Sequence, residues 1–254
     1  MALDGARAGP YDIVHRIAVD STSDEARRLL AAGAVVPFVV VADMQTAGRG
    51  RRGRAWQSEP GNLFASFVVR PGRAAADWPQ ASFAGALAVA DTVADLLNGA
   101  AALTLKWPND VLLGGEKVSG ILLESAGSQG GAASGPALII GIGINLQSRP
   151  AAPVVATCLA DHGGVAGVAE VLALLGRHLG RHLGVWQQDG FAPVRAAWLE
   201  RAHAAGERMD VRLAGETVQG AFADLDNSGA LVLDQNGTRR RIMAGDVALL
   251  AARP

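Results

Sequence analysis

The hydrophobic pattern of this 254-residue chain changes at Gly206, and the change divides the chain into two parts. After Met209 the apolar residues come in short alternating segments, separated by turn sequences such as Asn227-Ser228-Gly229 and Asn236-Gly237. Short strands at this spacing are typical of small β-barrels. We therefore predict one domain over residues 1–205 and a small barrel over 206–254. Its expected strands are 211–213, 218–225, 230–233, 239–243 and 247–250.

The first part contains longer elements. Continuous β-branched runs predict buried strands, and apolar residues spaced three or four apart predict helices. Half of all residues are hydrophobic and 5% are aromatic, which fits packed α/β layers. The expected strands are 35–41, 63–69, 103–106, 111–113, 118–124 and 138–146, and the expected helices are 24–32, 82–97, 165–186 and 192–205. Residues 1–12 read as a loose lead-in and 125–136 as a flexible connection, and Thr22 and Glu25 have capping-box spacing.

Composition excludes several classes of protein. The net charge of −1 argues against broad binding to nucleic acid or to a membrane surface. Cys158 is the sole cysteine, so an intramolecular disulfide and a multi-cysteine zinc site are both excluded. We expect it to be a small core residue in a protein of the reducing cytoplasm. The sequence has no apolar stretch long enough for a membrane span and no signal-peptide pattern.

A glycine–arginine run occupies residues 48–54, with Trp56 close behind it. Its glycines disfavour a stable helix or strand. One guanidinium group can bind two oxygens of a phosphate at once, and backbone amides can surround an anion. The run predicts a mobile loop that receives an anionic ligand, although a solvated basic turn or an RNA contact is also compatible with it. It is not a P-loop, because the G-x-x-x-x-G-K-[ST] pattern is missing.

Three further segments place polar residues beside strands. Lys106-Trp107-Pro108-Asn109-Asp110 forms a strand-end turn, and Lys117 opens a buried strand over 117–124. Gly141 and Gly143 alternate in the strand of 141–146, which leaves one face bare for a flat ligand. Taken singly, each segment also fits a structural role: an ordinary turn, a strand-edge lysine, or close packing of a helix.

Together, in this order and spacing, the four segments resemble the biotin protein ligase family over roughly residues 12 to 250. Residues 45–56 are similar to its biotin and adenylate loop, 106–110 to its KWPND element, 117–124 to its K-[VLI]-[SAC]-G-I-L-x-E strand, and 141–146 to its G-[IV]-G-[IL]-N strand. The resemblance implies an α+β fold. A mixed β-sheet with helices, like that of class II synthetases and lipoate ligases, precedes an SH3-like barrel.

The resemblance also implies a reaction. Biotin and ATP give biotinyl-5′-AMP and pyrophosphate, and biotin then passes to one lysine of a biotin carboxyl carrier protein. Lys117 and Arg51 are the implied catalytic residues, Mg²⁺ accompanies ATP, and no protein metal cage is expected. The implied biotin contacts are Ser21, Thr22, Ser23, Gln45, Arg49, Gly50, Arg51, Lys117, Gly120 and Gly143. The implied adenylate contacts are Arg49, Arg51, Arg54, Trp56, Asn109 and Asn145, with Asp110 beside them on the nucleotide and acceptor side.

The chain departs from the family pattern in three places. Ser21 and Thr22 come only twenty residues in, which leaves no room for the DNA-binding domain of the biotin repressors, so we expect a ligase without operator binding. Ser23 stands where asparagine is frequent, and Asp246 where Gly-Glu is common. The alternatives are a lipoate or octanoyl transferase of the same fold and a nucleic-acid-binding protein. The sequence leaves monomer and homodimer equally open.

Overall fold

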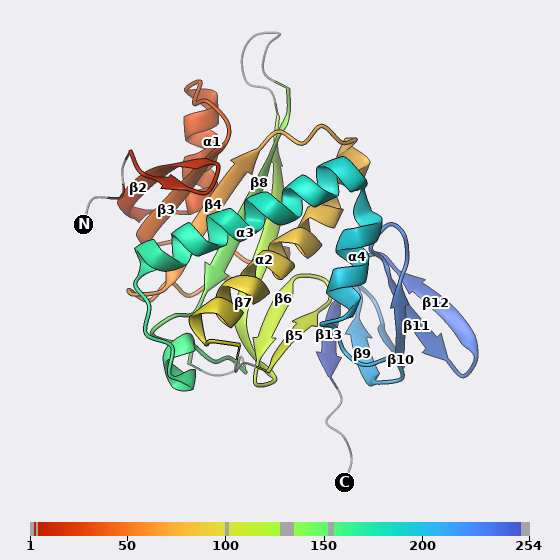
Figure 1. The fold of residues 1–254 in the computed structure, drawn as a ribbon. Coiled ribbons are helices and arrows are strands. Elements are labelled where there is room, and N and C mark those ends of the chain that lie inside the picture. The colour runs from red at the N-terminus through yellow and green to blue at the C-terminus, as the bar shows by residue number, and fades with distance from the viewer. Residues whose placement is uncertain (1–2, 4, 100–101, 128–134, 152–154, 250–254) are drawn as a thin grey trace.

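The chain folds around two β-sheets (Figure 1). The computed structural model describes the chain except residues 1–2, 4, 100–101, 128–134, 152–154 and 250–254. The eight strands of the large sheet follow the order β1-β2-β3-β4-β8-β7-β6-β5. Only β2 and β3 pair in parallel, so the sheet is mixed, as the α+β prediction requires. The strands are β1 Arg7–Ala8, β2 Tyr11–Val19, β3 Phe38–Gln45, β4 Leu63–Val69, β5 Leu103–Lys106, β6 Asp110–Leu113, β7 Glu116–Ala126 and β8 Ala137–Ile144.

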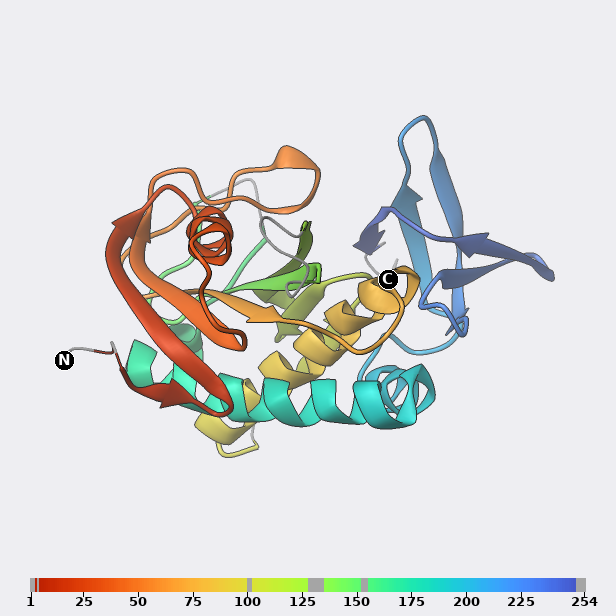
Figure 2. The same ribbon diagram turned by 90° about the horizontal axis from the view of Figure 1, so that it is seen from above.

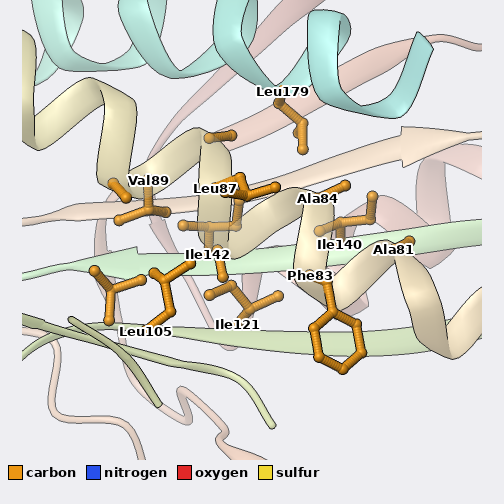
Figure 3. Packing of buried hydrophobic residues seen from close by; sticks show 14 of the residues in the cluster. Ala81, Phe83, Ala84, Leu87, Val89, Leu105, Ile121, Ile140, Ile142 and Leu179 are labelled. Carbon is orange, nitrogen blue, oxygen red and sulfur yellow. The ribbon is translucent and has the colours of Figure 1, made fainter. Parts of the chain in front are cut away.

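Helices cover both faces of this sheet. Figure 2 shows α2 (Ala81–Leu96) and α3 (Val168–Asp189) on one face and α1 (Thr22–Ala31) on the other. The sequence predicts one apolar face on α2, but this helix is buried almost all round because α3 covers the side that the sheet leaves free. Figure 3 shows Leu87 of α2 between Ile142 of β8 and the helix α3.

The second sheet is antiparallel and has the order β12-β11-β10-β9-β13. All five strands predicted after Gly206 are present, and the first of them pairs with both the second and the last. Its strands are β9 Arg208–Arg212, β10 Thr217–Leu225, β11 Leu231–Gln235, β12 Thr238–Ile242 and β13 Asp246–Leu249.

The two sheets share one hydrophobic core. Apolar residues of both belong to a single buried cluster. Phe83 of α2 makes edge-to-face contacts with Phe191 and Trp198 of α4 (Phe191–Leu199) at that junction. The indole Nε1 of Trp107 donates to the carbonyl of Gly229 over 3.0 Å. Gly229 lies at φ +87, and a Cβ there would come 2.7 Å from Phe83, so this turn needs glycine.

Three local predictions are wrong. Residues 1–12 contain β1 and the start of β2, because a short antiparallel pairing joins Arg7 to Asp12. The capping box is not formed: α1 begins two residues earlier, Ser21 is its N-cap, and Glu25 instead accepts hydrogen bonds from Arg16 and Arg28. The strand predicted to start at residue 35 begins only at Phe38, after Pro37, which has no N–H to donate to a neighbouring strand. The expected connection of 125–136 lies largely outside the described residues.

Candidate active site

A cavity of about 720 Å³ opens at the large sheet, beside the loop that carries the arginines. This volume lies within the usual range for small-molecule sites. Every site residue predicted from the sequence lies on its wall: Ser21, Thr22, Ser23, Gln45, Arg49, Gly50, Arg51, Arg54, Trp56, Asn109, Lys117, Gly120, Gly143 and Asn145. The fold therefore brings the four motifs together, and the role of each residue stays a prediction.

One wall is neutral and polar. Ser21, Thr22 and Ser23 stand at the N-terminus of α1 and are buried, and Gln45 ends β3 opposite them. The Oε1 atom of Gln45 accepts from the backbone amide of Thr22 at 2.9 Å and from its hydroxyl at 3.1 Å. Its Nε2 donates to Ser58 at 3.1 Å. The hydroxyls of Thr22 and Ser23 both contact Ser66 of β4.

The glycine strands are covered by an indole. A Cβ on Gly143 would come within 2.5 Å of the Trp56 ring, and one on Gly120 within 3.0 Å. The sequence predicts a bare face at Gly141 and Gly143. In the structure Gly143 and Gly120 form the face against which Trp56 lies, while a Cβ on Gly141 would instead come 3.3 Å from the Ser23 hydroxyl. Its buried Nε1 has no hydrogen-bond partner among the described residues. A buried N–H without a partner is costly, so this donor marks a place for a ligand or water acceptor.

Lys117 reaches the cavity from the start of β7. Its Nζ lies 2.6 Å from the Oδ1 of Asp110 and 5.5 Å from the centroid of the Trp56 ring. The ammonium group thus lies between a carboxylate and the face of an aromatic ring. Asn109 beside them donates to the carbonyl of Ile121 at 2.7 Å and accepts from Arg51 at 3.2 Å. The strand-end turn therefore binds two cations, Lys117 through Asp110 and Arg51 through Asn109.

The first arginine of the loop faces the sheet. Arg49 forms a two-pronged ion pair with Asp24 of α1 and lies 3.7 Å from Glu124 of β7. Arg27 binds both of these carboxylates as well. The hydrogen bond from Arg49 lowers the pKa of Asp24 below its ordinary value, against an opposing effect of burial. Arg49 thus anchors the start of the loop, with its charge balanced by acids of the protein itself.

The other arginines face the second sheet. Arg51, Arg52 and Arg54 approach the carboxylate of Asp246 at 3.9, 3.2 and 2.8 Å. Between them the chain makes a 3₁₀ turn, Arg51–Gly53, in which Arg52 has φ 56. The segment that was predicted to lack regular structure is closed by a hydrogen bond from the amide of Gly50 to the carbonyl of Arg54. Figure 2 shows this loop on the α1 side of the sheet, toward the second sheet.

Two cations of the cavity wall are partly withdrawn from water. Burial lowers the pKa of Lys106, and the nearby Asp110 partly offsets this. Burial also lowers the pKa of the Arg51 guanidinium, with Asp246 opposing the shift. Charges in such surroundings act on a bound anion more strongly than exposed ones do. This end of the cavity is therefore built for a ligand with several negative charges.

Sequence reasoning missed four polar residues of this region. Ser58 and Ser66 complete the hydrogen bonds of Gln45 and Thr22, Arg212 lies on the cavity wall, and Asp246 binds the arginine loop. Single serines carry no motif, and the last two lie about 160 or more residues from the arginines they approach, so no local signal could have found them. Asp246 was noted only as a departure from the family pattern.

Two residues have mainly structural contacts. Asn145 on the cavity wall donates from Nδ2 to the carbonyl of Thr157 over 3.0 Å, and its backbone amide binds Val118. It therefore fixes the segment that follows β8. Cys158 is buried, as expected, and burial raises the pKa of its thiol.

The described residues show neither a metal cage nor a membrane segment. Among them, no three histidine, cysteine, aspartate or glutamate side chains are grouped to hold a metal ion. None of the helices in the described ranges has the length and apolar character needed to cross a membrane.

Comparison with known proteins places the chain in a family. Residues 17–145 match the biotin/lipoate A/B protein ligase family, and residues 205–250 match the biotin protein ligase C-terminal domain. A biotin–[acetyl-CoA-carboxylase] ligase of Paracoccus denitrificans is 43% identical over 235 residues, which are 90% of this chain and 96% of that protein. A bifunctional ligase/repressor of Bacillus subtilis is 32% identical over 251 residues, 95% of this chain and 74% of the relative.

The fold agrees with these relationships. A biotin protein ligase from Aquifex aeolicus in complex with biotin and ATP superposes with a TM-score of 0.79 at 27% identity. The match covers 94% of this chain and 99% of that one. The fold is thus shared along almost the whole length, and the chain belongs to the biotin protein ligase family.

Proposed function

We propose that this chain is an ATP-dependent biotin protein ligase, which forms biotinyl-5′-AMP and transfers biotin to a lysine of a biotin carboxyl carrier protein. One observation carries the proposal: a single cavity joins a neutral hydroxyl and amide wall, an indole that lies on two glycines, and a cluster of cations. Biotin has a ureido ring, an apolar body and a carboxylate, which match these regions in turn. ATP adds the polyanion that the cationic end requires.

In the first half-reaction the biotin carboxylate attacks the α-phosphorus of ATP and pyrophosphate leaves. Lys117 is proposed to hold the carboxylate beside the α-phosphate and to balance the charge that builds there, with Asp110 orienting its ammonium. Arg51 and Arg54 bind phosphate oxygens after exchanging Asp246 for the ligand. Preorganised donors of this kind contribute about 10²–10³ in rate each in other enzymes.

In the second half-reaction the amine of the carrier lysine attacks the anhydride carbonyl, and AMP leaves. The amine must lose a proton, and we assign Asp110, the carboxylate on the cavity wall that binds Lys117, as the acceptor of that proton. No acyl-enzyme nucleophile is needed, because the adenylate is already the activated species. Cys158 has no part in this scheme.

We infer that Mg²⁺ enters with the nucleotide. The two carboxylates on the cavity wall, Asp110 and Asp246, are each paired with protein cations. Such donors fit a metal held mainly by phosphates and water. When bound, it would neutralise part of the phosphate charge.

Labelled biotin or lipoate, supplied with ATP, tests the proposed substrate. Wild-type protein should form biotinyl-AMP and no lipoyl-AMP, and the opposite result would establish the lipoate alternative. Lys117→Ala should lower the rate of biotin-dependent exchange between pyrophosphate and ATP by about 10²–10³. An unchanged rate would remove Lys117 from its central role.

Arg51→Gly tests the proposed closure of the loop over the adenylate. This change removes a cation that contacts both Asn109 and the second sheet, so biotinyl-AMP should escape and label lysines of unrelated proteins. Labelling of serum albumin by the variant and the wild type measures the leak. Equal labelling would contradict the assignment.

Other parts of the proposal concern partners and setting. We expect a cytoplasmic enzyme, either monomeric or homodimeric, that binds neither a membrane nor operator DNA. The rival nucleic-acid function predicts salt-dependent binding in the absence of biotin and ATP. In this structure the arginines of the loop are paired with Asp24, Glu124 and Asp246, which disfavours that rival.

A further inference from the structure

We propose that Ser66 is a positioning residue that fixes the direction of the hydroxyl hydrogen bonds at the ureido end of the cavity. The proposal rests on the proposed function. Ser66 belongs to β4 and is completely buried, while its neighbours Phe64 and Ala65 line the cavity. It therefore acts from behind the wall. Its Oγ lies 2.8 Å from the Thr22 hydroxyl and 3.0 Å from the Ser23 hydroxyl.

The direction of these bonds follows from one backbone group. The amide of Thr22 can only donate, so the atom of Gln45 that faces it at 2.9 Å must be the carbonyl Oε1. The Thr22 hydroxyl lies 3.1 Å from the same oxygen and must donate to it as well, since two acceptors would repel each other. A hydroxyl has one proton, so Thr22 is left to accept from Ser66.

The hydroxyls of Ser66 and Ser23 are constrained in the same way. Ser66 donates its only proton to Thr22 and is left to accept from Ser23 at 3.0 Å. The Ser23 hydroxyl thus keeps its lone pairs for the cavity. The Ser21 oxygen accepts a hydrogen bond from the amide of Ser23 at 3.3 Å. The hydroxyl proton of Ser21 is not used in this bond and can point into the cavity.

The wall therefore presents a directed pattern: a donor at Ser21 and an acceptor at Ser23. A cyclic urea has one carbonyl acceptor and two N–H donors, so it complements this pattern. Without Ser66, the Ser23 proton is free to turn toward the ligand, and the pattern is no longer fixed. Ser66 thereby contributes to the choice of a urea over a ring with the opposite polarity.

Binding of two biotin analogues to Ser66→Ala tests this role. The variant should bind biotin about tenfold more weakly, the equivalent of one neutral hydrogen bond. KM for ATP and kcat should stay within about twofold. An analogue with oxygen in place of one ring N–H of the urea presents an acceptor to Ser23, and its penalty relative to biotin should shrink in the variant. Desthiobiotin keeps the urea, so its ratio to biotin should not change.

Thr92→Val is the matched control. Thr92 is equally buried and gives its hydroxyl to the carbonyl of Ala88 at 2.7 Å, inside α2. It should lose stability without changing either analogue ratio. Ser66→Cys has a side chain of similar shape with a weaker donor and should give an intermediate penalty for the ring-oxygen analogue, which maintains the test if Ser66→Ala folds poorly.

Several results would overturn the proposal for Ser66. Unchanged biotin affinity and analogue ratios in both Ser66 variants would do so, as would the same changes in Thr92→Val. Wild-type protein that forms no biotinyl-AMP would instead overturn the proposed function, and the two failures are therefore separate.

Discussion

At the scale of single residues, the site depends on two glycines whose missing side chains leave room for an aromatic ring. Gly120 and Gly143 lie on neighbouring strands, and the indole of Trp56 rests against both. Lys117 lies over the same indole. A flat ring thus connects the arginine loop to Lys117, and its position is set by the lack of side chains beneath it.

We expect Gly143→Ala to displace Trp56. The added methyl group would lie 2.5 Å from the ring, which is closer than real contacts allow. Overpacking of this kind costs about 1–3 kcal/mol, so biotin should bind roughly ten- to hundredfold more weakly by calorimetry. Gly184→Ala in α3 meets no atom within 4 Å and should leave binding unchanged. Normal affinity of Gly143→Ala would show that the indole is free to move.

At the scale of elements, a largely buried carboxylate, with 12% of its side chain exposed, joins the helices of the outer layer. Asp91 of α2 accepts from His182 of α3 at 2.6 Å and from Arg201, just after α4, at 2.6 Å. Arg181 binds it too. Burial alone would raise the pKa of Asp91, but the hydrogen bonds outweigh this effect and hold it below its ordinary value. The ion cluster therefore stabilises α2 against its neighbours.

Asp91→Asn should lower the free energy of unfolding by about 1–3 kcal/mol at pH 7, since charged hydrogen bonds become neutral. A carboxyl whose pKa is lowered on folding stabilises above its unfolded pKa of about 3.9. That stabilisation is lost as the pH falls through the lower, folded value. Urea denaturation should therefore show a constant difference from wild type near neutrality and a smaller one below about pH 4.

Asp95→Asn is the matched control for that experiment. Asp95 lies on the same helix and binds His178 at 2.8 Å, but about half of its side chain is exposed. Exposed pairs contribute little, so this variant should change stability by less than about 1 kcal/mol. Equal losses for the two variants would contradict the role of the buried cluster.

At the scale of the whole molecule, the cavity depends on both sheets. Asp246 lies in β13, nearly 200 residues after the arginines that it binds. Trp107 joins the turn beside the cavity to Gly229 of the second sheet. One hydrophobic cluster includes residues of both sheets. Both sheets therefore contribute residues to the cavity. The domain boundary between residues 205 and 206 stays a prediction.

Asp246→Asn should free the arginine loop in the absence of ligand. Three guanidinium groups would lose their shared carboxylate, so the segment from Arg49 to Arg54 should open more often. Trypsin should then cut there several-fold faster than in wild type, as mass spectrometry of the fragments would show. Glu216→Gln removes an exposed pair with Arg240 in the same sheet and should not affect this cleavage. Equal cleavage rates in all three proteins would refute the link.

The sequence by itself determined the fold class, the two sheets and the motif residues of the cavity wall. It could do so because each motif is local: Lys117 opens its own strand, and Gly141 and Gly143 alternate within one strand. Element ends were less certain, since the pairing of Arg7 with Asp12 and the cap at Ser21 depend on neighbours that patterns do not include.

Only the tertiary structure decided how these residues are connected. Ser66 became part of the site because β4 passes behind α1, and Asp246 because β13 begins beside the loop. Neither carries a motif, and both act through hydrogen bonds and charge over a few ångströms. Such forces depend on distance in space, whereas a sequence pattern reports distance along the chain.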